Sequence, residues 1–156
     1  MILLVAVVFS IVVALIRGGS FNNLGQVEFR YGWLAILAFA LQAVNIWAPL
    51  ESGYGLMHPR TLLLLGSYGI LVAVVLLNRK LTGMIIIGLG LLLNLTVMVA
   101  NDGFMPVDLS ALKKAGLEQL AVSEEAGTRL TSTKDILLPR EETNLWVLSD
   151  IFVIPA

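Results

Sequence analysis

Residues 61–100 read TLLLLGSYGILVAVVLLNRKLTGMIIIGLGLLLNLTVMVA, and this stretch decides the fold class. Its charged side chains are Arg79 and Lys80, which separate two apolar runs at 61–77 and 82–100. A helix of about 20 apolar residues crosses the ~30 Å hydrocarbon core of a bilayer. Because the turn between the runs is so short, they predict an antiparallel pair of membrane-spanning helices.

Two further apolar runs lie closer to the N-terminus, at residues 1–16 and 32–48, and neither contains a charged side chain. Trp33 and Trp47 bracket the second run, as indole rings do at the two water interfaces of a membrane span. The first run is followed, not preceded, by its nearest basic residue, Arg17, which is the reverse of the order in a signal peptide. We therefore expect an all-α membrane protein. Its four transmembrane helices are predicted at about 1–16, 32–48, 61–77 and 82–100, in one bundle over residues 1–100.

The composition agrees with a membrane protein. Of the 156 residues, 58% are hydrophobic and 13% are charged, and the mean hydropathy is +0.90. Soluble domains are roughly 25% charged. The chain has no cysteine, which excludes disulfides, thiolate metal sites and cysteine nucleophiles.

The charges in the short loops predict the orientation. The two loops on one side of the predicted bundle carry Arg17, Arg30, Arg79 and Lys80, whereas the short loop on the other side carries Arg60. Positively charged loops favour the cytoplasm. We therefore expect a multi-pass protein of the bacterial cytoplasmic (inner) membrane, with its N-terminus and its C-terminal residues on the exoplasmic side.

Residues 101–156 are predicted to form a mixed, partly helical, exoplasmic tail. Asp108 or Ser110 can cap one short amphipathic helix, which is predicted to continue until Gly127. Its apolar positions are Leu112, Leu117 and Leu120. The residues after Gly127 favour strands and are too short an apolar run for a further span.

Amide side chains interrupt the apolar runs. Gln42 and Asn45 lie on the second predicted span, Asn94 lies on the fourth, and Asn101 follows it. An amide that faces lipid leaves its donors and acceptors unpaired, so we expect these side chains to point into the bundle or towards a polar cavity. Two interpretations remain open: interhelical hydrogen bonds, at about 0.6 to 2 kcal/mol each, or the lining of a ligand or ion path.

The sharpest local motif is NDGFMPV at 101–107, directly after the fourth predicted span. Asn101 and Asp102 can hydrogen-bond to the groups that a helix end leaves free. Gly103 suits a left-handed cap, and Pro106 prevents the helix from continuing. We expect a structural role for these four residues.

No catalytic residue is predicted, because the chain contains none of the GxSxG, HExxH, Walker or dinucleotide-binding patterns. His58, the single histidine, is expected to be a surface or hydrogen-bonding residue rather than an axial ligand. We predict no metal site and no cofactor, although a bound lipid or pigment is compatible with the sequence.

Several of these residues resemble a family of small bacterial integral-membrane proteins known only as a domain of unknown function. The resemblance is carried by Arg17-Gly18-Gly19, Trp33-Leu34, Gln42, Asn78-Arg79, Asn94 and above all NDGFMPV. It covers most of residues 1–110 and returns near Ser149-Asp150. It implies a multi-span membrane protein whose members continue into one more apolar span after the stretch that residues 154–156 begin, and it carries no activity.

Two functions are compatible with these features. The first is a non-catalytic accessory or structural subunit of a larger bacterial membrane complex, of the energy-transducing or photosynthetic kind. The second is a small oligomeric transporter or channel with an amide-lined path. A lipid-modifying enzyme that uses Asp102 and Asp108 has the least support. The expected partners are the lipid bilayer and other membrane subunits, and nucleic acid is not among them.

Overall fold

A computed structural model describes residues 2–20, 22, 26–47, 55–121, 125–130 and 133–149. This part of the chain is mostly helical. Its elements, in order, are α1 (Ile2–Ile16), α3 (Gly32–Trp47), α4 (Pro59–Leu77), α5 (Thr82–Ala100), β1 (Met105–Val107), α6 (Leu109–Lys114), β2 (Asp135–Leu137), and the short 3-10 helices η1 (Glu118–Leu120) and η2 (Trp146–Leu148). Residue 48 of the second predicted span and residues 150–156 of the predicted tail lie outside the described residues.

Two of the described helices, α4 and α5, are long and apolar enough to cross a membrane. They coincide with the spans predicted at 61–77 and 82–100. α1 and α3 have 15 and 16 residues. At 1.5 Å per residue such helices extend about 24 Å or less, which is shorter than the ~30 Å hydrocarbon core. Among the described residues, the structure therefore shows two apolar helices that are long enough to span a membrane, and four spans are not shown.

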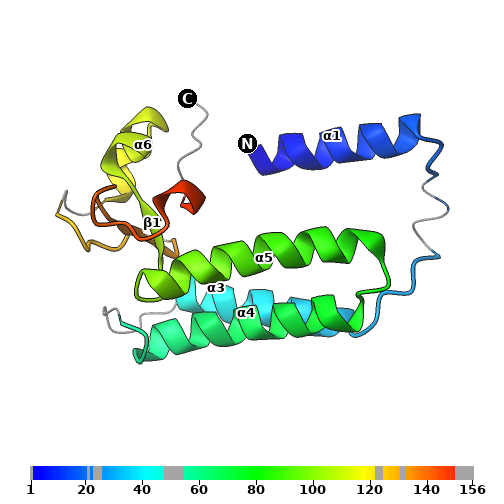
Figure 1. Cartoon of the computed structure of the whole chain (residues 1–156), viewed down its shortest axis with the longest axis horizontal. Coiled ribbons are helices and arrows are strands. Elements are labelled where there is room, and N and C mark those ends of the chain that lie inside the picture. The colour runs from blue at the N-terminus through cyan, green and yellow to red at the C-terminus, as the bar shows by residue number, and fades with distance from the viewer. Residues whose placement is uncertain are drawn as a thin grey trace.

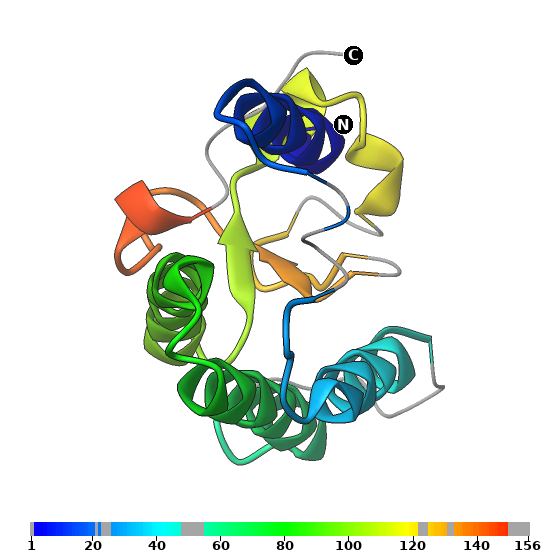
Figure 2. The ribbon, with the colours of Figure 1, turned by 90° about the vertical axis from the view of Figure 1, so that its right-hand side faces the viewer.

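The helices α1, α3, α4 and α5 run roughly along one axis and alternate in direction (Figure 1). α3 packs on α4, and α4 packs on α5, so that these three helices form one layer. α1 lies apart from α4 and α5 in both views (Figures 1 and 2). β1, α6 and η2 gather at the end of the layer where α5 finishes, so the tail lies at one end of the molecule (Figure 1).

α4 begins at Pro59, two residues before the predicted start. The side chain of His58 accepts a hydrogen bond from the backbone N–H of Arg60, with 3.3 Å between Nδ1 and N. Pro59 occupies the first helical turn, where its missing N–H costs nothing. His58 therefore acts as the N-cap of α4.

The tail contains a parallel pair of strands, in which Met105, Pro106 and Val107 pair with Asp135, Ile136 and Leu137. A parallel pair needs a long crossover, and α6 and η1 belong to it. One apolar cluster of the tail consists of Val107, Ala111, Leu112, Leu130 and Leu137. Met105 belongs instead to the cluster of the helix layer, with Leu64, Tyr68, Val97 and Met98, so the tail and the layer share apolar contacts.

The predicted tail helix is shorter than the sequence suggested. Asp108 caps α6 as expected, since its carboxylate accepts a 2.6 Å hydrogen bond from the N–H of Ser110. The helix ends at Lys114 and not at Gly127, because Gly116 adopts a left-handed conformation with φ of 65°. The N–H of Leu117 then returns to the carbonyl of Leu112, as in a helix-terminating turn.

Candidate functional site at the junction of the helix layer and the tail

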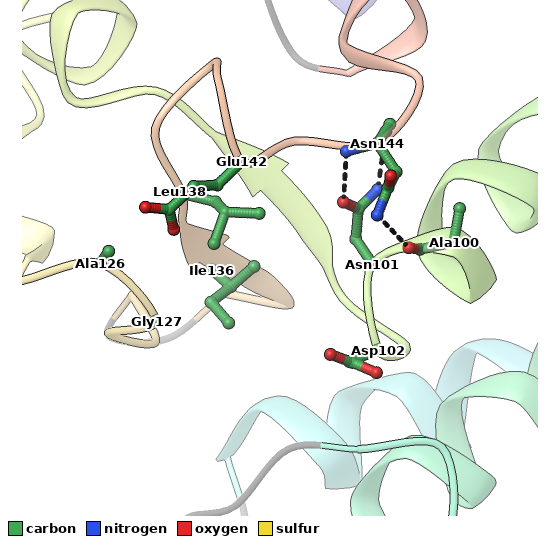
Figure 3. A pocket seen from close by; sticks show the side chains of 9 residues that line it. All are labelled: Ala100, Asn101, Asp102, Ala126, Gly127, Ile136, Leu138, Glu142 and Asn144. Carbon is green, nitrogen blue, oxygen red and sulfur yellow. Dashed lines mark hydrogen bonds between the residues drawn. The ribbon is translucent and has the colours of Figure 1, made fainter.

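Asn101, the residue directly after α5, connects the end of this helix to a distant part of the tail by hydrogen bonds. Asn101 is buried, and its Nδ2 donates to the carbonyls of Val97 and Asn144 at 2.8 and 2.9 Å. Its Oδ1 accepts from the N–H of Asn144 at 2.9 Å, and the amide of Asn144 in turn donates to the carbonyl of Ala100 at 2.9 Å (Figure 3). This clasp, Asn101 with Asn144, satisfies carbonyls that the helix end leaves free.

The next two residues turn the chain out of the helix. Asp102 and Gly103 both have positive φ, 56° and 93°, and the N–H of Gly103 donates to the carbonyl of Met98 at 2.7 Å. Gly103 also lies against α4, because a Cβ added to it would lie 2.0 Å from Cγ2 of Thr61. Pro106 is buried in β1, so the turn at 101–103, rather than this proline, ends the helix.

Asn45 links α3 to α4 at the same end of the layer. Its side chain is 2% exposed, and its Nδ2 donates to the carbonyl of Arg60 at 2.7 Å. Arg129 of the tail donates from Nη2 to the carbonyls of Asn45 and Thr133 at 3.3 and 2.9 Å. The guanidinium also lies 5.7 Å from the ring centre of Phe104, so one tail arginine contacts both α3 and the turn after α5.

A tail lysine reaches the interior of the layer. Lys134 donates from Nζ to the hydroxyl of Tyr68 at 2.7 Å, and the same ammonium lies 5.4 Å from the ring centre. Tyr68 is 3% exposed in the middle of α4. Neither Arg129 nor Lys134 was predicted from the sequence as a site residue. The one local signal was a tyrosine hydroxyl within an apolar run, because a buried hydroxyl needs a partner.

A pocket of about 310 Å³ opens beside the clasp (Figure 3). It is lined by Ala100, Asn101, Asp102, Ala126, Gly127, Ile136, Leu138, Glu142 and Asn144. The carboxylates of Asp102 and Glu142 are its charged groups, and both residues are exposed. Within the described residues, no group of three or more histidine, aspartate or glutamate side chains could hold a metal ion.

The structure does not bring the other predicted amides into this site. Gln42 is half-buried on α3, whereas Asn94 is exposed on α5. Asn94 was expected to point into the bundle or towards a polar cavity, and in the described structure its side chain is exposed. The apolar cluster of the layer uses Leu91, Leu95 and Met98 of α5, and Asn94 lies one helical turn before Met98. Among the described residues, the Asn94 side chain has no hydrogen-bond partner.

A model of the family of unknown function DUF5317 matches residues 26–156. The chain belongs to this family. The resemblance to a domain of unknown function is thereby confirmed, with a different extent, because the match begins after Arg17-Gly18-Gly19 and includes the whole tail. The junction, from Asn45 to Asn144, therefore falls within the part that the family shares. No curated protein and no solved structure matches the chain.

Proposed function

We propose that this protein is a non-catalytic accessory subunit of a larger bacterial membrane complex. In this proposal α4 and α5 span the inner membrane, the shorter α1 and α3 also span it with local thinning of the bilayer, and the tail caps the exoplasmic end of the layer. The low burial of the helices supports a hydrocarbon surrounding. Only 33% of the apolar window in α4 and 17% of that in α5 are buried, whereas the core helix of a soluble protein is largely covered.

The charges at the two ends support the orientation. The end opposite the tail carries Arg17, Arg30, Arg79 and Lys80, in the connections that join α1 to α3 and α4 to α5. Positive charges in short loops favour the cytoplasmic face. With α4 and α5 spanning, the junction with its two asparagines then lies on the exoplasmic side.

One observation carries the subunit proposal: an uncovered stripe on α5 that combines two glycines with one amide. Gly83, Ile87, Gly90 and Asn94 recur at helical spacing and are all exposed. At Gly83 and Gly90 an added Cβ would meet only open space. Small residues allow a second helix to approach closely, and an amide in hydrocarbon needs a partner. The stripe therefore suits a helix of another subunit.

The hydroxyls of the same layer show why Asn94 differs. Thr96 donates to the carbonyl of Leu92 at 2.8 Å, and Ser67 donates to the carbonyl of Leu64 at 2.6 Å. Each hydroxyl is thus satisfied within its own helix. Asn94 has two donors and an acceptor and satisfies none of them within the described chain, which leaves the side chain available to another protein.

The amide-lined path has less support. The Asn45 and Asn101 amides are engaged in internal hydrogen bonds, and the Asn94 side chain is exposed. Donors and acceptors that are already paired offer nothing to a passing solute.

The test is assembly in the native membrane. Wild-type chain, extracted in a mild detergent, should migrate in native gels as a complex of fixed composition. Asn94→Leu and Gly90→Leu should each reduce the assembled fraction by about tenfold, the equivalent of ~1.4 kcal/mol. Gly66→Leu is the matched control, since Gly66 of α4 is exposed and also faces open space. A wild-type chain that always migrates alone would contradict the proposal.

A further inference from the structure

We propose that the end of the molecule opposite the tail binds the phosphate of an anionic phospholipid headgroup. The site is a pocket between the α4–α5 turn and residues 26–30. The inference rests on the membrane placement proposed above, and it adds a ligand that the subunit proposal does not require.

The pocket has a volume of about 680 Å³. Its polar lining combines the cations Arg30, Arg79 and Lys80 with the carboxylate of Glu28, so positive charge is in excess. Its apolar lining includes Leu76 and Leu77, which are 60% and 46% exposed at the end of α4. A cationic rim next to exposed hydrocarbon fits an amphiphile better than a soluble anion.

A buried asparagine builds this pocket. Asn78 is 4% exposed, and its Oδ1 accepts from the N–H of Arg30 at 2.7 Å. Its Nδ2 donates to the carbonyls of Arg30 and Val74 at 2.9 and 2.8 Å. These bonds hold Arg30 beside the turn that contains Arg79 and Lys80, although Arg30 lies 48 residues from Asn78 in the sequence.

The position of Arg30 beside Arg79 and Lys80 brings positive charges together, and their mutual repulsion disfavours this arrangement. A bound phosphate removes this repulsion and forms charge-assisted hydrogen bonds with arginine. The location suits a lipid, because basic pockets at the cytoplasmic ends of membrane helices bind anionic headgroups. Trp33, at the start of α3 and 60% exposed, is a residue type found at headgroup depth.

The experiment is native mass spectrometry of the full chain, purified in detergent and mixed with phosphatidylglycerol or phosphatidylcholine of the same acyl chains. Wild type should retain phosphatidylglycerol selectively. Arg79→Gln with Lys80→Gln should weaken that retention about 25-fold, which corresponds to two charge contacts of roughly fivefold each. Lys113→Gln with Lys114→Gln is the control, since it removes another adjacent, exposed pair of basic residues at the tail end. Arg30→Gln is a second variant that leaves the Asn78 backbone contacts in place.

Equal retention of the two lipids by wild type, or equal weakening by both double variants, would overturn the proposal. Displacement of phosphatidylglycerol by inorganic phosphate at similar concentration would overturn its lipid part and leave a simple anion site. The assay uses the isolated chain, so it does not depend on a partner subunit. Failure of Asn94→Leu to alter assembly would therefore count against the subunit proposal alone.

Discussion

At the residue scale, two asparagines perform the same task at opposite ends of the helix layer. Asn78 follows α4 and Asn101 follows α5, and each donates to the carbonyl four residues before it. Each also pairs with both the N–H and the carbonyl of one distant residue, Arg30 for Asn78 and Asn144 for Asn101. A helix end leaves carbonyls without partners, and one amide here satisfies a carbonyl and fixes a remote segment at once.

Replacement of Asn101 by leucine should open the junction. The change removes three hydrogen bonds, at about 0.5–1.5 kcal/mol each, and leaves the N–H of Asn144 without its acceptor. We expect the free energy of local opening to fall by about 2–4 kcal/mol. Amide hydrogen exchange of β1 and β2 measures it. In the isolated chain Asn94→Leu, which replaces an exposed amide, should change exchange little, and similar effects of both substitutions would refute the role of the clasp.

Gly103→Ala should be poorly tolerated for two separable reasons. A non-glycine residue in the left-handed region costs roughly 1–2 kcal/mol, and the new Cβ would clash with Cγ2 of Thr61. Thermal unfolding in detergent should show a clear loss of stability. Adding Thr61→Ser removes the clashing methyl group and should recover only part of it. Gly90→Ala, in open space, should be neutral, and an equal loss at both glycines would argue against this explanation.

The chemistry of single residues was partly readable from the sequence. NDGFMPV predicted the end of a helix, because asparagine and glycine directly after an apolar span are typical of a helix C-cap. The exposure of Asn94 was not predictable, because the helical period shows which residues share a face but not how far along the helix a neighbouring element covers that face. Arg129 and Lys134 were missed because their partners, Asn45 and Tyr68, are far away in the sequence.

At the element scale, the tail is tied to the layer by side chains rather than by long secondary structure. β1 and β2 each have three residues, and a pair of such short strands is marginal without other contacts. Met105 in the layer cluster, the clasp, Arg129 and Lys134 supply those contacts. The position of the tail therefore depends on a few polar links.

The link between Lys134 and Tyr68 can be measured with a double-mutant cycle. Lys134→Met and Tyr68→Phe should each destabilise the tail, and together by less than their sum. A hydrogen bond to a charged group predicts a coupling of about 1.5–3 kcal/mol. The control pairs Tyr68→Phe with Lys114→Met, because Lys114 lies on α6 and its side chain is exposed. A coupling near zero for the first pair would show that the contact contributes nothing.

Helices were predictable where the sequence pattern that specifies them lies within the helix or next to it. The runs at 61–77 and 82–100 became α4 and α5, and Asp108 became the N-cap of α6. The end of α6 was predicted wrongly because Leu117 and Leu120 continue the helical spacing, while Gly116 breaks the backbone earlier. Nothing local indicated that 105–107 would pair with 135–137, since parallel pairing joins segments separated by a long crossover.

At the scale of the whole molecule, the central proposal is that hydrocarbon, rather than water, surrounds the helix layer. Most of the outward surface of α5 is hydrocarbon, with Ile85, Ile86 and Leu89 exposed by 65%, 73% and 61%. Exposed apolar surface on this scale is unfavourable in water. Lipid tails or a partner helix would cover it, and the two charged ends would then face the two aqueous compartments.

The most direct test uses the absence of cysteine from the chain. Single cysteines in place of Glu142, Lys80 and Ile86, all exposed residues, would be treated with a membrane-impermeant maleimide on spheroplasts. The proposed orientation, with the tail on the exoplasmic side, predicts that Glu142→Cys reacts in intact spheroplasts and Lys80→Cys only after permeabilisation. Ile86→Cys should react in neither state, because in the proposed membrane placement hydrocarbon surrounds it. Reaction of Ile86→Cys as fast as that of Glu142→Cys would show that water surrounds α5 and would contradict the account.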